Sequence, residues 1–420
     1  MQIPITKHDF HKLPLWLCWL SIVYMLTGCG GSGGGADAGA MDVSACNSAT
    51  GLRAPLPACS PDTPCTRVAT NLGVQTIETA EVIPVCDGLY WDARLTQSVI
   101  GFTRHACIVR PIGASNTSRR PLVVWFHGGG DGSADDAATT TQLVAKAGNF
   151  DLTGDVARPG FTLLAIQGRN LRFPTAAPRD GHHHDFYYRD LDSPSTNPDI
   201  ANVDAFIDTV VLEGIVDTNR IYVMGWSNGA FFSQMYAIAR NTTTTPGGNN
   251  VASASVFSAA SPFDDISWNV LDNEALDGND SSCALRNIPS STVPIQMVYR
   301  TSDSAVACDT AQSTCFQTEP GYVTEQWVSD ASNAGIPIQG LRIGGLESGA
   351  SATQDADAPN CTDFTGSCPV VDCSNSPTND GCLSLINHLR WPDGDYNNPT
   401  AFVMDREPDM LLFLKNNPHM

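Results

Sequence analysis

The sequence predicts an α/β fold in which helices cover both faces of a mostly parallel, doubly wound sheet. Unbroken apolar runs of strand length recur along the chain, and a strand that is buried on both faces needs such a run. Helical patterns lie between these runs, which is typical of a parallel sheet. The chain of 420 residues, 42% hydrophobic, can build one large core or two medium ones. The predicted strands cover 105–111, 121–126, 161–166, 220–225, 251–259, 293–300 and 336–343.

Helices are predicted between and after these strands, and the first of them has the clearest boundaries. Asn197 suits the cap of a helix, Pro198 its first position and Gly214 its end. The apolar residues between them fall on one helical stripe, so this helix packs one face on the sheet. Further helices are expected over 228–240 and 408–415.

The N-terminus has the pattern of an export signal. Lys7 and Lys12 precede an apolar run over 13–26 that is too short for a comfortable membrane span but matches the core of a signal peptide. The run ends in LTGC (26–29), which is similar to the bacterial lipobox, where the cysteine is acylated. Cleavage after the AGA at 38–40 is the alternative, but that site lies far from the apolar run.

We therefore predict a lipoprotein signal peptide over 1–28, an acyl anchor on Cys29 and a Gly/Ser-rich tether over 29–45. The net charge of −21 opposes binding to nucleic acid and to anionic membrane surfaces. We expect a monomer at the cell envelope or secreted, in contact with membrane only through its lipid.

The cysteines favour disulfides in an exported protein. Of 14 cysteines, Cys18 lies in the signal and Cys29 would carry lipid, which leaves an even number that can form up to six bridges. A metal site is the alternative, but no C-x-x-C occurs, so neither a metal nor a cofactor is expected. Residues 46–95 are rich in Cys and Pro and are predicted to be a disulfide-tied leader on a catalytic domain over 96–420.

The stretch GWSNG at 225–229 is the candidate for a catalytic nucleophile. It fits G-x-S-x-G, follows a predicted strand and precedes a predicted helix. Such a turn exposes the hydroxyl of Ser227 and needs small residues on both sides. The same pattern at 30–34 has neither strand nor helix beside it and reflects the composition of the tether.

A nucleophilic serine needs a base and an orienting acid. In the order Ser, acid, His, the base must follow Ser227, where only His388 and the penultimate His419 remain, and the second is expected to fray. His388 is therefore the predicted base. Asp303, at the end of a predicted strand, is the predicted acid, with Asp309 and Asp330 as rivals.

Backbone N–H groups are expected to hold the oxyanion. One belongs to Asn228, the residue after the nucleophile. The other is assigned to Gly129 in FHGGGDG, with Gly128 as second choice, because glycines let the backbone approach the substrate.

These blocks together resemble a known family. PLVVWFHGGG, DTNRIYVMGWSNGAFF, VPIQMVYRTSD and NHLRWPDG are similar, in order, to blocks of polyhydroxybutyrate-depolymerase-like esterases, including feruloyl and acetylxylan esterases. The resemblance covers about 100–415 and implies an α/β-hydrolase fold and a metal-free serine esterase, with the roles given above at matching positions. The acid block lacks the family's His-Gly, and Asn387 stands where Gly is usual.

Two further features concern the substrate. The run GHHHDFYYRD at 181–190 is predicted to be a solvated loop; contact of its aromatics with substrate and metal binding by His182, His183 and His184 are alternatives. Trp226 and Trp391 flank the catalytic candidates and are predicted to bind substrate, or else to belong to the core. The expected function is hydrolysis of a plant cell-wall ester or an aliphatic polyester. The alternatives are a non-catalytic binding lipoprotein and a serine peptidase on the same fold.

Overall fold

A computed structural model describes the parts of the chain that carry the predicted fold, all within one compact unit, Asp37–Met420. The predicted signal peptide, Cys29 and the tether lie outside the described residues. None of the described helices is long and apolar enough to cross a membrane. The described residues are 77–78, 81–87, 90–130, 132–173, 179–186, 194–241, 251–263, 290–300, 323–343, 388, 391–392 and 408–419.

The main sheet has 8 strands in the order β11-β10-β9-β8-β4-β5-β3-β2. Only β3 runs antiparallel to its neighbours β2 and β5, and the remaining pairs are parallel. The strands are β2 (Ala93–Val99), β3 (Phe102–Val109), β4 (Arg120–Phe126), β5 (Thr162–Ile166), β8 (Val216–Trp226), β9 (Ser253–Phe257), β10 (Ile295–Arg300) and β11 (Ile338–Ile343). The predicted mostly parallel sheet is confirmed.

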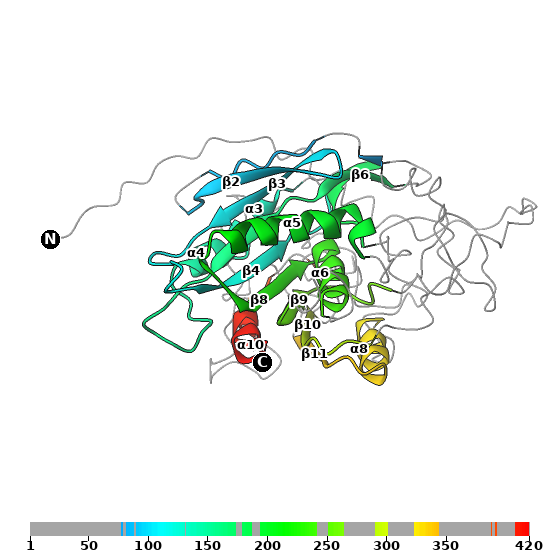
Figure 1. Cartoon of the computed structure of the whole chain (residues 1–420). Coiled ribbons are helices and arrows are strands. Elements are labelled where there is room, and N and C mark those ends of the chain that lie inside the picture. Colours follow the sequence, from blue (N-terminus) through cyan, green and yellow to red (C-terminus); the bar gives the residue numbers. More distant parts are fainter. Residues whose placement is uncertain are drawn as a thin grey trace, which may run out of the picture. The chain divides into compact units, whose positions relative to one another are not determined.

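Helices cover both faces of this sheet, as a doubly wound fold requires. Alternate residues of β4 enter two separate cores: Leu122 and Phe126 pack with α5 and α6, whereas Trp125 packs with α3 and α10. Figure 1 shows α5 crossing in front of the strands. The described helices are α3 (Ala134–Thr140), α4 (Leu143–Ala147), η2 (Pro194–Thr196), α5 (Pro198–Leu212), α6 (Asn228–Ala239), α8 (Val323–Asn333) and α10 (Met410–Asn416).

Local sequence explains the boundaries of α5. The Asn197 side chain accepts from the N–H groups of Asp199 and Ile200, Pro198 occupies the first turn, and Gly214 follows the end with φ of 78°. Helix α6 has no such side-chain cap, and it is buried along its whole length against β8, β9 and β4. Its position is therefore set by packing, since an uncapped helix depends on tertiary contacts.

A second, 3-stranded antiparallel sheet was not predicted. It contains β1 (Ile77–Glu78), β6 (Arg169–Phe173) and β7 (Arg179–His183) in the order β1-β6-β7. The polar run that the sequence suggests to be a solvated loop thus begins inside a β-hairpin. This hairpin matters for the site because β7 bridges to Gly130, in the loop after β4.

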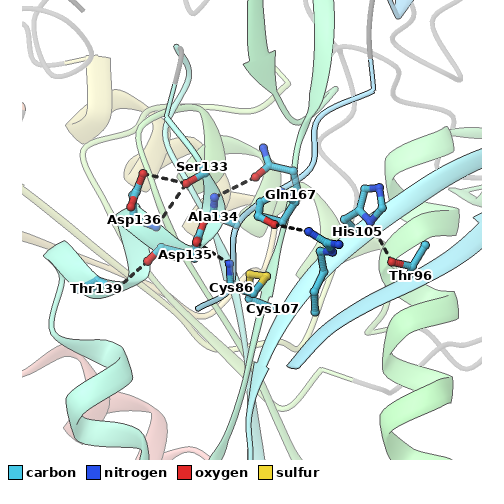
Figure 2. Close-up of a disulfide and its surroundings, with 12 residues drawn as sticks. Cys86, Thr96, His105, Cys107, Ser133, Ala134, Asp135, Asp136, Thr139 and Gln167 are labelled. Atoms are coloured by element: carbon cyan, nitrogen blue, oxygen red, sulfur yellow. Dashed lines mark hydrogen bonds between the residues drawn. A yellow bond between two sulfur atoms is a disulfide. The ribbon is translucent and has the colours of Figure 1, made fainter. Parts of the chain in front are cut away.

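The end of the leader is tied to the main sheet, as predicted. A disulfide joins Cys86 to Cys107 on β3, and the Cys86 N–H donates to a carboxylate oxygen of Asp135 at 2.8 Å (Figure 2). Nearby, His105 Nε2 lies 2.7 Å from Glu81, which fastens the same segment to β3. With the serine turn after β8, this architecture is the predicted α/β-hydrolase fold.

Candidate active site

Ser227 lies in a sharp turn between the central strand β8 and helix α6. Its φ of 54° and ψ of −121° are strained for a residue other than glycine. Its backbone N–H donates to the carbonyl of Phe257 on β9 at 3.0 Å, so the turn is fixed to the neighbouring strand. The predicted strand, turn and helix around Ser227 are therefore all present.

Space explains both glycines of the G-x-S-x-G pattern. A methyl group on Gly225 would lie 2.3 Å from the carbonyl oxygen of Gly229. A methyl group on Gly229 would lie 2.2 Å from the carbonyl oxygen of Phe126, at the end of β4. Contacts this short force the backbone apart, so the first turn of α6 can approach β4 and β8 only if both residues are glycine.

His388 reaches Ser227 from a position 161 residues further along the chain. Its Nε2 lies 2.9 Å from the Ser227 Oγ, the hydrogen-bond distance expected between a nucleophile and its base. The Trp226 indole N–H donates to the His388 backbone carbonyl at 2.9 Å. The residue next to the serine therefore also holds the histidine in place, and the two predicted catalytic side chains are in contact.

A second serine touches the other side of the same imidazole. Ser258 Oγ lies 2.7 Å from His388 Nδ1. Ser258 directly follows β9, which ends at Phe257 because Ser258 has a φ of 63°. Sequence reasoning missed this residue and extended the strand through it, since nothing in VASASVFSA marks one serine as different from the others.

The predicted acid, Asp303, lies outside the described residues, as does its rival Asp309. The other rival, Asp330, is on helix α8 and not at the end of a strand. Strand β10 ends at Arg300 and pairs with β9, so its carboxyl end lies beside that of the strand before Ser258. The role of Asp303 stays a prediction.

Backbone groups beside Ser227 are placed to hold an oxyanion. Asn228 begins α6, so its N–H has no carbonyl one turn earlier, and none of the described residues accepts from it. The loop of glycines that follows β4, which we call the glycine loop, runs alongside the serine turn. A methyl group on Gly128 would lie 3.5 Å from the Ser227 Cβ, and one on Gly129 would lie 3.4 Å from the Asn228 Cβ. Both predicted donors thus lie next to the serine turn.

Strand β7 holds the glycine loop from outside. Gly130 and His182 exchange two backbone hydrogen bonds, of 3.2 and 2.6 Å. The His182 ring Nδ1 also lies 2.7 Å from the carbonyl oxygen of Gly132. The ring of His183 leaves no room beside Gly129, where a methyl group would lie 2.6 Å from its Nδ1. Adjacent histidines therefore fix three positions of the loop.

The next residue of the run fixes the start of α6. The Asn228 Oδ1 accepts from the His184 N–H at 2.8 Å, and its Nδ2 donates to the His184 carbonyl at 3.2 Å. These two bonds tie the side chain of Asn228 to the backbone that continues β7. One short segment, His182–His184, thus contacts both sides of the candidate oxyanion hole, and we call it the clamp.

A buried ionic cluster anchors the clamp. Arg169 on β6 donates to both oxygens of Asp199 on α5, at 2.8 and 3.1 Å, and its guanidinium lies 3.5 Å from Asp185. The Asp185 N–H also donates to Asp199 at 2.7 Å. All three side chains are buried, and removing one partner of such a cluster typically costs about 3–5 kcal/mol.

Two neutral histidines support the glycine loop from inside the protein. His127 Nδ1 donates to the Gly128 carbonyl at 2.7 Å, and its Nε2 accepts from the Gly168 N–H at 2.9 Å, which fixes its tautomer. Burial lowers the pKa of His127 to about 4. Burial also lowers the pKa of His184, whose ring centroid lies 4.7 Å from that of His127. A charge on either ring is unfavourable here.

The prediction of a solvated loop over 181–190 is wrong for the described part, 181–186. His184, Asp185 and Phe186 are buried, and the Phe186 ring stacks on Phe231 of α6. Phe186 is thus a core residue; Tyr187 and Tyr188 lie outside the described residues. Where the structure is described, no three His, Cys, Asp or Glu side chains gather as metal ligands would.

The two predicted substrate-binding tryptophans pack against each other under the site. Trp226 is only 8% exposed, and Trp391 makes edge contacts with the rings of Trp125, Trp226 and Phe257. Their visible contacts are those of core residues that support the His388 segment. Binding of substrate by either ring stays a prediction.

The proteins found to be similar to this chain are solved structures. No protein-family model matches the sequence, and no curated protein is similar to it. An esterase from Rhizomucor miehei is 14% identical over 60% of this chain and 73% of its own, with a TM-score of 0.39. A Pyrobaculum calidifontis esterase is 15% identical over 70% of this chain and 83% of its own, with a TM-score of 0.39. A Pyrococcus horikoshii acylaminoacyl peptidase is 10% identical over 60% of this chain and 37% of its own, with a TM-score of 0.33. Similarity this distant does not indicate an activity, and the geometry of the site has to do so.

Proposed function

We propose that this chain is a serine ester hydrolase that works through an acyl-enzyme. The contact between Ser227 Oγ and His388 Nε2, 2.9 Å long and located at a strand-to-helix turn, carries the proposal. A hydroxyl placed beside an imidazole on a rigid turn is the arrangement that nucleophilic catalysis needs. The structural surroundings agree, since the loop with Gly128 and Gly129 lies alongside the same turn.

The first half of the reaction follows from this geometry. Nε2 of His388 takes the proton of the Ser227 hydroxyl as its oxygen attacks the carbonyl carbon of the ester. The charge that develops on the carbonyl oxygen is held by the N–H groups of Asn228 and Gly129, next to the positive end of the α6 dipole. His388 then gives its proton to the departing alcohol, which leaves the acyl group on Ser227.

The second half repeats these steps with water. His388 takes a proton from the water as its oxygen attacks the acyl carbon, and the same N–H groups hold the second oxyanion. The proton returns to Ser227 when the acyl group leaves as a carboxylic acid. Asp303 is proposed as the acid that stabilises the imidazolium in both halves.

For the substrate, we propose an ester of the kind cleaved by the polyhydroxybutyrate-depolymerase-like family, either a feruloyl or acetyl ester of the plant cell wall or a hydroxyalkanoate polyester. The ordered sequence blocks around Ser227, Asp303 and His388 support this class.

A panel of substrates tests the function and selects among these esters. The purified chain is mixed with p-nitrophenyl acetate, a feruloyl ester, a hydroxybutyrate oligomer and a peptide anilide, each beside the Ser227→Ala variant. We expect Ser227-dependent release of acid from at least one ester, and much slower cleavage of the anilide. Faster cleavage of the anilide would point to a peptidase. No turnover of any substrate, with equal behaviour of the variant, would point to a non-catalytic binding protein.

We also propose that the protein is exported and anchored at the cell envelope by acylation of Cys29. The LTGC stretch at 26–29 and the Gly/Ser-rich residues after it support this proposal. Metabolic labelling with an alkyne fatty acid in a bacterial host is the test. Label in the wild-type chain but not in Cys29→Ala is expected, and equal labelling of both would contradict it.

A further inference from the structure

The imidazole of His388 lies between two serine hydroxyls that come from adjacent strands. Nε2 lies 2.9 Å from Ser227 Oγ, and Nδ1 lies 2.7 Å from Ser258 Oγ. Ser227 follows β8 and Ser258 follows β9, and these two strands pair in parallel up to Trp226 and Phe257. The proposed mechanism gives no role to Ser258.

The protons on the imidazole determine what Ser258 can do. His388 can accept a proton from Ser227 only in the neutral form that has a bare Nε2 and a hydrogen on Nδ1. In that form Nδ1–H points at the oxygen of Ser258 and donates to it. The opposite tautomer would place N–H on the side of Ser227 and remove the base. A hydroxyl can donate or accept, and it accepts from Nδ1 when the ring is in this reactive form.

The backbone around Ser258 holds its hydroxyl in this position. Its φ of 63° is unusual for a residue other than glycine, so the backbone here is strained. Its N–H donates to the carbonyl of Val298 on β10 at 2.9 Å, which fixes the turn after β9. The residue is fully buried, with 0% exposure, so its oxygen is not open to a substrate carbonyl. This backbone conformation of Ser258 is kept because its N–H is bonded to the sheet and its hydroxyl to the imidazole.

We propose that Ser258 is a positioning residue: its hydroxyl accepts the Nδ1–H of His388, orients the ring toward Ser227 and stabilises the imidazolium formed during the reaction. This inference rests on the proposed serine esterase function. It goes beyond it because it assigns the Nδ1 partner to a second serine, in addition to the carboxylate expected from Asp303. This hydrogen bond strengthens when the ring becomes charged, which is the state that follows proton transfer from Ser227.

Kinetics of Ser258→Ala test this role. A hydrogen bond to a charged group is worth about 1.5–3 kcal/mol, so we expect kcat to fall about ten- to a hundredfold while KM changes little. The loss should be confined to kcat, because the imidazolium that loses its partner forms only after the substrate has bound. Loss of packing around the site would change KM as well.

Two further variants separate the role from a folding defect. Ser258→Gly removes the hydroxyl but tolerates the positive φ, so it should fold and show the same kinetic change. Ser255→Ala is the matched control, since Ser255 is a buried serine on β9 whose hydroxyl donates to Gln296 at 2.9 Å, away from His388. It should keep the wild-type kcat and KM. Full activity in both Ser258 variants would overturn the proposal.

An NMR readout keeps the inference testable if the proposed function fails. Spectra of ¹⁵N-labelled histidine, with the His388 signals assigned through His388→Gln, show which ring nitrogen carries the hydrogen without any substrate. We expect it on Nδ1 in the wild-type chain, with a changed Nδ1–H signal in Ser258→Ala because the hydrogen bond is lost. Identical signals in both proteins would refute the role of Ser258 even if esters are cleaved. An inactive chain that shows the change would refute only the esterase function.

Discussion

Ser227 and Ser258 share a residue type, a positive φ and a neighbour, yet they are suited to opposite tasks. Both follow a strand of the parallel sheet, both have positive φ, and both donate their backbone N–H to the next strand. Ser227 is followed at once by α6 and keeps 9% exposure, whereas Ser258 is fully buried. Contact with an imidazole thus does not define a nucleophile. Access and a nearby helix N-terminus separate the serine that we propose to attack from the serine that we propose to orient the ring.

The surroundings of the two serines differ in the same way. Beside Ser227 lie a glycine loop and the clamp, which hold two candidate N–H donors. The described contacts of the Ser258 turn are instead a backbone bond to Val298 and the ring of His388. A developing negative charge can therefore be stabilised beside Ser227.

The largest effect is expected from the attacking hydroxyl itself. Ser227→Ala should lower kcat/KM for an activated ester by about 10⁴- to 10⁶-fold, since without its nucleophile the site keeps only binding and oxyanion stabilisation. The fold should remain, because alanine tolerates the burial and no bond of the Ser227 hydroxyl other than that to His388 is found among the described residues. Steady-state kinetics and circular dichroism check both statements. A variant that retains a tenth of the activity would break the distinction between the two serines.

The second-largest effect is expected on the free energy of unfolding. It comes from a histidine that supports the glycine loop beside Ser227. Burial lowers the pKa of His127 from 6.5 to about 4, so between these values the unfolded chain binds a proton that the folded chain does not. The free energy of unfolding should therefore fall by about 3 kcal/mol as the pH drops from about 6.5 to about 4.

Urea denaturation at several pH values measures this loss, with His127→Gln as the comparison. The variant cannot titrate at this position, so its stability should depend less steeply on pH over the same window. The buried His184 ring acts in the same direction and should leave part of the slope in place. Identical slopes in the two proteins would mean that His127 does not remain neutral in the folded state.

The smallest effect is expected from the bonds between α6 and the clamp. Asn228→Ala removes both side-chain bonds to the His184 backbone but keeps the Asn228 backbone N–H that the mechanism uses. We expect kcat to fall about tenfold and stability to fall by about 1–2 kcal/mol, because two buried backbone groups lose their partners. Ser233→Ala, on the same helix with a hydroxyl bonded to the Gly229 carbonyl, is the control and should lose stability with a smaller change in kcat. If both variants behave alike, the clamp contributes to folding only.

Sequence reasoning found the parts of the site that follow from local chemistry. The glycines around Ser227 are visible because the turn has no space for a side chain, and His388 follows from the order of the few remaining histidines. The same reasoning predicted the sheet and the boundaries of α5, where each signal lies within a few residues.

The remaining parts depend on contacts between distant segments. Ser258 lies in an apolar run with other serines, and its positive φ is imposed by Val298 and His388, which no local pattern reveals. The run that begins at Gly181 was misread because His184 and Asp185 are buried by partners elsewhere in the chain, among them Asn228, Arg169 and Asp199. An unusual polar run beside a predicted active site was the signal that could have pointed to it.

The most direct test of the central claim is to find which serine reacts with a fluorophosphonate. Trypsin separates the two candidates, because Ser227 falls in the peptide 221–240 and Ser258 in the peptide 241–286. Mass spectrometry of the labelled wild-type chain should place the probe on Ser227, with slower labelling in Ser258→Ala and none in Ser227→Ala. Label on Ser258, or undiminished labelling of Ser227→Ala, would contradict the account.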